Sequence, residues 1–599
     1  MSNATNLINR RKARRRTALA AIGLLAIVSV FVVKLVDIQV VNAAELNVDS
    51  LHKRSIAAKT YGLRGDIVDT DGVVLADSVE RYNITASPII ALAAPTFKRT
   101  VSKKTATKPA VKEVVTFDQA LAELAGATGE KVSDLRASIT KDPESDFAYL
   151  SKSSTLEVLR AVRALNIPWV YDERQPSRTY PNGAVAGNLV GFIGTDGPQA
   201  GLELSEDSCI ASTDGSSTYE RGADGVRLPG STVTTKQATD GGTLKLTIQR
   251  DFQYYVQDAI ADRAKEVGAD WATGIVVRVK DGHLMAVADY PSVDPNNVGG
   301  VSPGSLGSLA FTTPYEPGST FKPMTTAMLF DEGKATAATE LVVPGRLAVG
   351  GTTIGDVWAH GDIRFTTAGI LVNSSNVGIS MLSDRLSKKD RYSYLKKFGI
   401  GEKTDVGFLY ESAGNLKKPA DWDDITNYAI TFGQGVTATS AQVASIYQTL
   451  GNDGVKMPLT LVEGCEHADG SVTELPKTKG ERVVSKKAAK TTVAIMENVV
   501  TQGGLVDSVP IDGYRIAAKT GTAQVAENGR YGTERIVSVA GLFPAEDPEY
   551  AVVVTMGKPD IMKTSAAAAP AFRKILTQII KEFRVTPSTK KAAKIPLNW

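Results

Sequence analysis

The longest hydrophobic pattern is an apolar stretch near the start of the chain. Residues 18–33 carry no charge, and the apolar character continues to Val41, interrupted by Lys34, Asp37 and Gln39. About 20 such residues are needed to cross a bilayer as a helix. We therefore predict a transmembrane anchor over residues 17–41.

The residues that flank this stretch give the anchor a direction. Residues 1–16 end in a basic cluster of five arginines and one lysine. Basic residues before an apolar helix stay in the cytosol, so the rest of the chain should lie outside the cell. The alternative is a cleaved signal peptide with small residues at Ala43 and Ala44. The apolar run is longer than a usual signal core, which favours the uncleaved anchor.

After the anchor, residue patterns predict a first, mixed domain over residues 42–240. Apolar and polar residues alternate over 65–76 around Asp71-Gly72, which predicts a β-hairpin. Helical spacing occurs in 117–124 and 155–165. Residues 95–112 are rich in Lys, Thr, Ala and Pro, from which we expect a mobile loop whose role the sequence does not assign.

A second pattern begins near Gly241 and predicts an α/β domain over residues 241–584. The expected strands are 243–248, 273–279, 283–288, 536–542 and 550–556. The expected helices are 251–267, 322–332, 366–386, 440–450 and 568–583. We expect the tail, residues 585–599, to be unstructured.

Composition limits the classes of function. The chain has 599 residues, 43% of them hydrophobic and 22% charged, which fits several folded domains. The net charge of +3 is too even to predict a nucleic-acid-binding surface over the whole chain. Cys209 and Cys465 are the only cysteines, and we expect them to stay unpaired.

The most informative segment for chemistry is 316–323, which contains Ser319-Thr320-Phe321-Lys322. A serine and a lysine three residues apart at the start of a helix lie one turn apart on the same face. A desolvated lysine has a lowered pKa and can take the proton of a serine hydroxyl. The spacing alone is weak evidence, because Ser-x-x-Lys also occurs at Ser50, Ser138, Ser393 and Ser588.

Two further motifs strengthen the interpretation. Ser374-Ser375-Asn376 is the only Ser-x-Asn in the chain, and Lys519-Thr520-Gly521 is the only Lys-Thr-Gly. Taken singly, the first is equally typical of a helix cap and the second of an edge strand with an exposed lysine. All three motifs in this order are hard to obtain by chance.

This trio resembles the motifs of penicillin-binding proteins and the related β-lactamases. The resemblance implies a serine acyl-transferase fold, in which the motifs meet in one cleft between an all-helical part and a sheet. It makes Ser319 the nucleophile and Lys322 its base. Ser374 would relay a proton to the leaving amine, Asn376 would hold the substrate's amide, and Ser375 would point away from the cleft.

The resemblance also assigns roles to the third motif. Lys519 would supply positive potential beside the second motif, while Thr520 and Thr522 would bind the terminal carboxylate of a peptide. Gly521 would let the backbone approach the substrate. The backbone amides of Ser319 and Thr522 would form the oxyanion hole.

Further segments resemble boxes of the class B penicillin-binding proteins, which carry an elongated α+β pedestal of the dimerisation type before the transpeptidase domain. These are Arg64-Gly65-Asp66-Ile67, Arg178-Thr179-Tyr180-Pro181, Gly201-Leu202-Glu203, Asp294-Pro295-Asn296 and Phe432-Gly433-Gln434-Gly435. No stretch resembles the glycan-polymerising domain of class A enzymes. The form Glu-Pro-Gly-Ser-Thr-Phe-Lys-Pro is most similar to the division-specific enzyme.

The resemblance implies a peptidoglycan D,D-transpeptidase that cross-links stem peptides ending in D-Ala-D-Ala during septal wall synthesis. β-Lactams would be covalent inhibitors, and a membrane glycan polymerase and other division proteins would be partners. No cofactor, metal or nucleic acid is expected. An elongation-specific transpeptidase and a catalytically weak scaffold remain alternatives.

The residues present argue against two unrelated classes of enzyme. Gly300-Val301-Ser302-Pro303-Gly304 fits the nucleophile elbow of α/β-hydrolases, but Pro303 has no N–H to donate to an oxyanion. A metal hydrolase lacks ligands, because the four histidines, His52, His283, His360 and His467, have no paired spacing.

Overall fold

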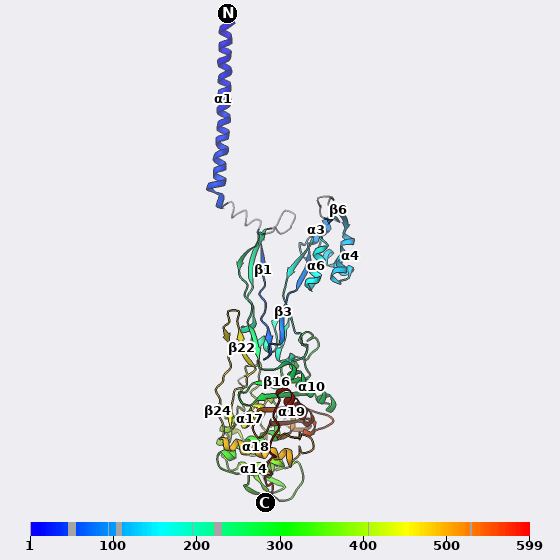
Figure 1. Cartoon of the computed structure of the whole chain (residues 1–599), viewed down its shortest axis with the longest axis vertical. Helices are drawn as coiled ribbons and strands as arrows, with labels where there is room; N and C mark the ends of the chain where they lie inside the picture. Colours follow the sequence, from blue (N-terminus) through cyan, green and yellow to red (C-terminus); the bar gives the residue numbers. More distant parts are fainter. Residues whose placement is uncertain are drawn as a thin grey trace. The chain divides into compact units, whose positions relative to one another are not determined.

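The computed structural model describes residues 2–45, 55–93, 95–102, 111–194, 196–220, 230–404, 406–527 and 530–599. It divides into two compact units (Figure 1). The first comprises residues 1–62 and 212–239, and the second comprises residues 63–211 and 240–599. His52 and Ser50, which the sequence analysis named, lie outside the described residues.

The first unit contains the predicted anchor. Helix α1 (Ser2–Val36) continues into a π-helical turn (Asp37–Val41). Residues 12–41 include an 18-residue window with a mean hydropathy of 2.7, none of which is buried in the protein, as expected for a membrane-spanning helix. The same unit holds an antiparallel three-stranded sheet, formed by β1 (Ser55–Thr60), β12 (Gly215–Glu220) and β13 (Val233–Lys236).

The predicted hairpin over residues 65–76 is confirmed in the second unit. Strands β2 (Ile67–Val68) and β3 (Val74–Val79) pair antiparallel. The carboxylate of Asp69 closes the turn by accepting the N–H groups of Asp71 and Val73 at 2.9 and 2.7 Å. Its other oxygen accepts the N–H of Arg250 at 2.8 Å, which caps the first turn of α10 (Arg250–Val267).

These strands belong to a six-stranded sheet in the order β23-β22-β14-β2-β3-β9. Its other members are β14 (Thr243–Leu246), β22 (Val462–Glu466), β23 (Val472–Thr473) and β9 (Ser177–Thr179). The disulfide between Cys209 and Cys465 lies beside it, with Cα atoms 5.9 Å apart. Our expectation of unpaired cysteines was therefore wrong. The two cysteines are 256 positions apart in the sequence, and only the tertiary fold creates their contact.

Three of the sequence boxes meet near this sheet in a buried cluster of charges. The carboxylate of Glu203, which is fully buried, accepts hydrogen bonds from Arg64 Nε at 2.7 Å and from Arg178 Nε at 2.6 Å. Arg64 also donates to Asp207 at 2.6 Å, and Arg178 donates to the carbonyl of Gly65 at 2.8 Å. Buried charges persist only when they are paired in this way, so the three boxes hold the chain together locally.

A separate small core lies within residues 82–174, around Ile84, Leu121 and Trp169. Its antiparallel strands are β7 (Ala148–Ser154), β4 (Tyr82–Ala86) and β8 (Val170–Arg174). Its helices are α3 (Pro88–Ala93), α4 (Phe117–Thr128), α5 (Val132–Thr140) and α6 (Leu156–Ala164). The helical predictions for 117–124 and 155–165 are thus confirmed.

The prediction of a mobile loop over residues 95–112 was wrong for the parts described. Strands β5 (Thr96–Ser102) and β6 (Val111–Thr116) pair antiparallel, while residues 103–110 lie outside the described residues. Val115 is buried, and Arg99 is held by Glu113 at 3.1 Å and Glu123 at 2.5 Å. Composition suggested a loop, but the strand pairing, the burial of Val115 and the ion pairs of Arg99 make a strand pair.

The second α/β domain is built on a five-stranded antiparallel sheet in the order β16-β15-β27-β26-β25. Its strands are β15 (Trp271–Arg278), β16 (Leu284–Tyr290), β25 (Ala517–Glu527), β26 (Arg530–Phe543) and β27 (Tyr550–Gly557). Helices α10 and α19 (Ala569–Phe583) contact each other (Figure 1); α10 also contacts β15 and β16, and α19 contacts β26 and β27. Helix α17 (Ser440–Gly451) contacts β15, β26 and β27, and α18 (Lys486–Thr501) contacts β25. All β27 residues are buried, as expected for a strand covered on both faces.

The helical part of this domain packs against α18. It contains α12 (Lys322–Asp331), α13 (Thr367–Val372), α14 (Asn376–Ser383), α15 (Lys388–Lys397) and α16 (Asp424–Ala429). Short strand pairs border it: β17 (Glu340–Val343) with β20 (Ile363–Thr366), and β18 (Arg346–Val349) with β19 (Thr352–Gly355). The single helix predicted over 366–386 is broken at residues 373–375, where Ser374 has a φ of 58°.

The tail also differs from the prediction. Residues 585–599 contain no helix, but they are not unstructured. The carbonyl of Leu597 accepts the N–H of Thr366 at 3.0 Å, and Asn598 pairs with Phe365 as an antiparallel bridge. A Cβ on Gly369 would lie 1.9 Å from that carbonyl, so the glycine is what lets the tail approach α13.

Candidate active site

The turn that carries Ser319 begins a long helical segment. A short 3₁₀ turn (Gly318–Phe321) runs directly into α12, so Ser319 and Lys322 are one turn apart, as the spacing predicted. Ser319 is half-buried, while Gly318, Thr320 and Lys322 are buried. The hydroxyl of Ser319 is therefore the accessible group on this turn.

Glycines on two other segments hold the turn from either side. The N–H of Gly318 donates to the carbonyl of Gly433 at 2.9 Å, and a Cβ on Gly433 would lie 2.2 Å from the carbonyl of Gly318. A Cβ on Gly521 would lie 2.4 Å from Ser538 Oγ and 2.9 Å from the carbonyl of Pro317. These distances are far below normal contact, so the Ser319 turn is clamped between the Phe-Gly-Gln-Gly box and strand β25.

The structure brings all three motifs together around Ser374. The ammonium of Lys322 donates to Ser374 Oγ at 3.2 Å and to Asn376 Oδ1 at 2.7 Å, and it also bonds the carbonyl of Ser374. The ammonium of Lys519 donates to Ser374 Oγ at 2.9 Å and to Thr520 Oγ1 at 3.2 Å. Ser374 is thus the point at which both lysines meet.

The direct bond between Lys322 and Ser319 is not formed in this state. Among the described residues, the hydrogen bonds of Lys322 Nζ go to the Ser-Ser-Asn motif and none goes to Ser319 Oγ. The amine lies one turn from the hydroxyl on the same helical segment, and in the absence of substrate such bonds are commonly long.

The third motif lies on the edge strand of the sheet. In β25, Lys519 pairs with Ala540 and Thr522 with Val537 of β26, and β25 has its other edge free of strand pairing in the described sheet. Lys519 is fully buried, so the alternative of an edge strand with an exposed lysine does not hold. Thr522 is exposed. An edge strand offers unpaired backbone groups to an extended peptide.

Burial lowers the pKa of both lysines, and repulsion by Lys519 adds to the shift of Lys322. Burial lowers the pKa of Lys322 well below its usual value, and the charge of Lys519 lowers it further, while Asp356 raises it in part. Burial lowers the pKa of Lys519 to about 7. A lysine with a lowered pKa is neutral in a larger fraction of molecules and can act as a base near neutral pH.

Sequence reasoning missed Asp356, Glu316 and Tyr531. Asp356 is fully buried against the second motif, and Glu316 accepts the N–H of Gly435 at 2.8 Å and the hydroxyl of Tyr531 at 3.1 Å. Glu316 thereby links the segment before Ser319 to the Phe-Gly-Gln-Gly box and to strand β26. Glu316 stood inside the recognised segment 316–323, but nothing in the sequence pattern pointed to Asp356.

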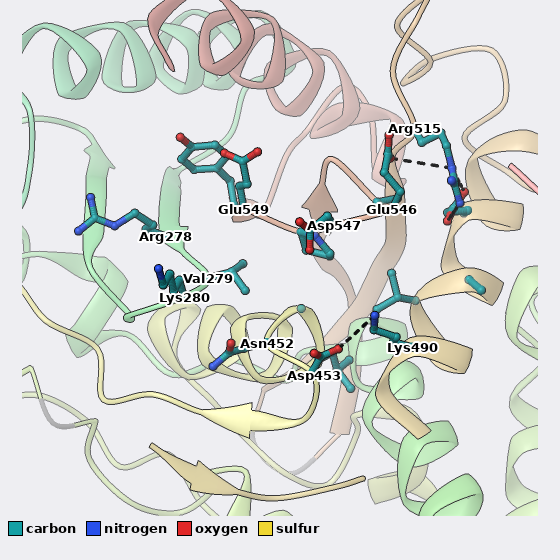
Figure 2. A pocket seen from close by; sticks show the side chains of 18 residues that line it. Arg278, Val279, Lys280, Asn452, Asp453, Lys490, Arg515, Glu546, Asp547 and Glu549 are labelled. Carbon is teal, nitrogen blue, oxygen red and sulfur yellow. Dashed lines mark hydrogen bonds and ion pairs between the residues drawn. The ribbon is translucent and has the colours of Figure 1, made fainter. Parts of the chain in front are cut away.

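A separate hollow lies away from the three motifs. A hollow of about 470 Å³ lies between the end of α17, helix α18 and the turn that joins β26 to β27 (Figure 2). Its walls are charged with both signs, and Arg515 is paired there with Glu497 at 2.7 Å, while Lys490 approaches Asp453 at 3.7 Å (Figure 2). None of the three motifs lines it, so we assign the chemistry to the motif cluster and not to this cavity.

Models of two known protein families match the chain. The penicillin-binding protein transpeptidase domain matches residues 272–577, and the penicillin-binding protein dimerisation domain matches residues 59–246. Penicillin-binding protein PbpB of Mycolicibacterium smegmatis is 33% identical over 96% of this chain and 90% of its own length. Peptidoglycan D,D-transpeptidase FtsI of Escherichia coli K12 is 30% identical, over 78% of this chain and 77% of its own.

Solved structures give the same result. A peptidoglycan synthetase from Bifidobacterium adolescentis aligns with a TM-score of 0.71 at 30% identity, covering 91% of this chain and all of its own. Penicillin-binding protein 3 from Mycobacterium tuberculosis, in complex with ampicillin, aligns with a TM-score of 0.68 at 27% identity, covering 90% of this chain and all of its own.

Proposed function

Because the chain belongs to the class B penicillin-binding proteins, we propose that it is a peptidoglycan D,D-transpeptidase that cross-links stem peptides through an acyl-enzyme on Ser319. The observation that carries this proposal is the meeting of two fully buried lysines at one hydroxyl, that of Ser374, with one of these lysines, Lys322, one turn from the half-buried Ser319. The relatives with the division names PbpB and FtsI support a role in septal wall synthesis.

In the first half-reaction Ser319 Oγ attacks the carbonyl between the two terminal D-alanines of a stem peptide. Lys322 accepts the hydroxyl proton, which its lowered pKa permits. A positioned base of this kind contributes roughly 100- to 10,000-fold in rate. The N–H groups of Ser319 and Thr522 stabilise the oxyanion, and one such donor is worth about 3 kcal/mol.

The second and third motifs hold the peptide and move its protons. Ser374, bonded to both lysines, passes a proton to the departing D-alanine amine. Asn376 holds the substrate's amide, and Thr520 and Thr522 on the edge of β25 bind its terminal carboxylate beside Lys519. In the second half-reaction an amine of a neighbouring stem peptide attacks the acyl-enzyme, and the same groups act in reverse.

The apolar helix supports a single-pass membrane protein with the catalytic domain outside. The basic residues in the first part of α1, before its apolar stretch, remain in the cytosol, and residues 42–240 act as a pedestal for the transpeptidase domain, residues 241–584. A membrane glycan polymerase and other division proteins are the partners we propose, because this chain cross-links strands that another enzyme must make. β-Lactams, which occupy solved relatives, would acylate Ser319.

A mass spectrum of the full-length chain after penicillin treatment tests the nucleophile. We expect a single adduct on the peptide that contains Ser319, and none in Ser319→Ala. Ser393→Ala is the matched control, since Ser393 also begins a Ser-x-x-Lys on a helix but is exposed on α15. An adduct that survives Ser319→Ala, or a wild-type protein that stays unlabelled, would contradict the proposal and favour the scaffold.

Turnover distinguishes the three enzymes that share this acyl-enzyme. With a stem peptide and an amine acceptor, we expect release of D-alanine together with formation of the cross-linked product. Hydrolysis of the peptide without transfer would identify a carboxypeptidase. Rapid loss of the penicillin adduct would identify a β-lactamase.

A further inference from the structure

The start of α14 is held by a side chain far from it in sequence. Asp356 directly follows β19, and one oxygen of its carboxylate accepts the N–H groups of Asn376 at 2.5 Å and Val377 at 3.0 Å. The other oxygen accepts the hydroxyl of Ser375 at 2.7 Å, and that hydroxyl in turn accepts the N–H of Gly378 at 2.8 Å. The free N–H groups of a helix start need such partners, and a carboxylate also suits the positive end of the helix dipole.

These contacts of Asp356 matter because Ser374, the residue just before them, has a strained backbone. Ser374 has a φ of 58°, in the left-handed region that serine rarely adopts and that costs about 1–2 kcal/mol. In this conformation of the break between α13 and α14, its hydroxyl is bonded to both lysines. Asp356, which fixes Ser375 and Asn376 on one side of Ser374, supplies the contacts that keep the break in place.

The carboxylate itself is held by a histidine. His360 Nε2 lies 3.0 Å from the second oxygen of Asp356, and His360 Nδ1 lies 2.5 Å from the carbonyl of Gly361. Both ring nitrogens therefore face oxygen acceptors, which only the imidazolium can satisfy with two N–H donors. The ring of Trp358 stacks on His360 with centroids 5.3 Å apart, and the side chain of His360 is only 7% exposed.

The charged groups around the pair lie on two sides. Asp356 and Asp362 face the imidazole, and although desolvation lowers the pKa of His360, the bonds to Gly361 and Asp356 and these two charges raise it overall. On the other side, Asp356 acts on Lys322, whose charge it favours, and Lys519 opposes that effect. A proton on His360 therefore weakens the influence of Asp356 on Lys322.

We propose that Asp356 and His360 form a positioning pair for acyl transfer: the carboxylate holds the start of α14, and with it Ser374 and Asn376, against Lys322, and the imidazole holds the carboxylate. The inference rests on the proposed acyl transfer at Ser319. It adds that the pair, through its charge, sets the pH at which Lys322 becomes an effective base.

The test is the second-order rate constant for acylation by a fluorescent penicillin, measured from pH 5 to 9 on the full-length protein in detergent. Asp356→Asn keeps the shape and removes the negative charge, and His360→Gln removes the positive charge. The maximal rate of Asp356→Asn should fall about tenfold or more, because small displacements of reacting groups carry large costs. The acidic limb of its pH–rate profile, where Lys322 becomes protonated, should move to lower pH. The reason is that the variant lacks the negative charge of Asp356, which favours protonation of Lys322.

His360→Gln should show the opposite shift. Without the imidazolium the full charge of Asp356 acts on Lys322, and the acidic limb moves to higher pH. The matched controls are Asp423→Asn, which removes a carboxylate that caps α16 through the N–H of Thr426, and His283→Gln, on the turn between β15 and β16. Both controls should keep the wild-type profile.

The outcomes separate the two proposals. Total labelling at saturation counts the folded, active molecules, and the position of a limb does not depend on that count, so poor folding cannot imitate the result. Failure of the wild-type chain to label at Ser319 would overturn the proposed function itself. If both variants label normally and the acidic limbs of their pH–rate profiles are unshifted, or shift in the same direction, the positioning pair is overturned and the proposed function remains intact.

Discussion

Lys519 should make the folded protein less stable below neutral pH, and replacing it by methionine should show this. The side chain is fully buried on β25, and burial lowers its pKa from 10.5 to about 7. Below about pH 7 the folded protein must carry a charge in a site that disfavours it. Methionine has a similar length and no charge, so Lys519→Met removes that penalty.

The size of the effect follows from the shift. A fall from 10.5 to about 7 corresponds to about 5 kcal/mol, at about 1.4 kcal/mol for each tenfold change in the proton affinity. The variant also loses the bonds of Lys519 to Ser374 Oγ and to Thr520, worth about 1 kcal/mol each. The net gain in free energy of unfolding should be about 2–4 kcal/mol at pH 6.

The pH dependence has a definite sign. For a base whose folded pKa is lowered, the unfolded chain binds more protons between the two pKa values, so stability rises with pH between about 7 and 10.5. Above that range the wild-type penalty is gone. Lys519→Met should therefore be more stable than wild type at pH 6 and no more stable at pH 10, where most of the wild-type penalty is gone and the lost bonds outweigh the rest.

Urea unfolding followed by tryptophan fluorescence at both pH values measures the difference, and penicillin labelling checks that the variant has lost activity. Lys486→Met, at an exposed lysine paired with Asp453, is the control and should show no such crossing. A Lys519→Met protein that is less stable than wild type at pH 6, or that differs equally at both pH values, would refute the reasoning.

Three further outcomes follow from single contacts. Replacing both Cys209 and Cys465 by serine should lower the free energy of unfolding by about 2–5 kcal/mol, measured in urea, and reductant should then have no further effect; equal stability with and without the bond would contradict this. Burial raises the pKa of Asp289 to about 7, so the stability that Asp289 contributes should fall by about 4 kcal/mol from pH 4 to pH 8. In urea titrations, the free energy of unfolding of wild type minus that of Asp289→Asn should fall by this amount over the same range; a difference that stays constant would refute it. Gly521→Ala places a methyl group 2.4 Å from Ser538 Oγ and should slow penicillin acylation at least about tenfold, with partial recovery in Gly521→Ala/Ser538→Gly; wild-type acylation rates in the single variant would show that β25 is not clamped there.

Features carried by local pattern were predictable. The apolar run of α1, the Asp-Gly hairpin of β2 and β3, and the helical spacing of α10 and α19 depend on neighbours in the sequence, and the structure confirms each. The same holds for the one-turn spacing of Ser319 and Lys322.

Predictions failed where we inferred structure from composition or spacing, although contacts with other parts of the chain decided it. The lysine-rich segment became β5 and β6 because Arg99 finds Glu113 and Glu123, and the tail is ordered because Leu597 bonds Thr366. The predicted helix over 366–386 breaks at Ser374, although its residues have helical spacing. In each case the deciding partner is distant in sequence.

The sequence by itself determined which side chains can do the chemistry, since a nucleophile, two lysines and an amide must be encoded as residue types. The tertiary structure alone decided their properties. Burial makes Lys519 a group with a pKa of about 7, and it is the fold that places Asp356 under Ser375 and joins Cys209 to Cys465. Desolvation and charge pairing depend on distances through space, which a linear pattern does not contain.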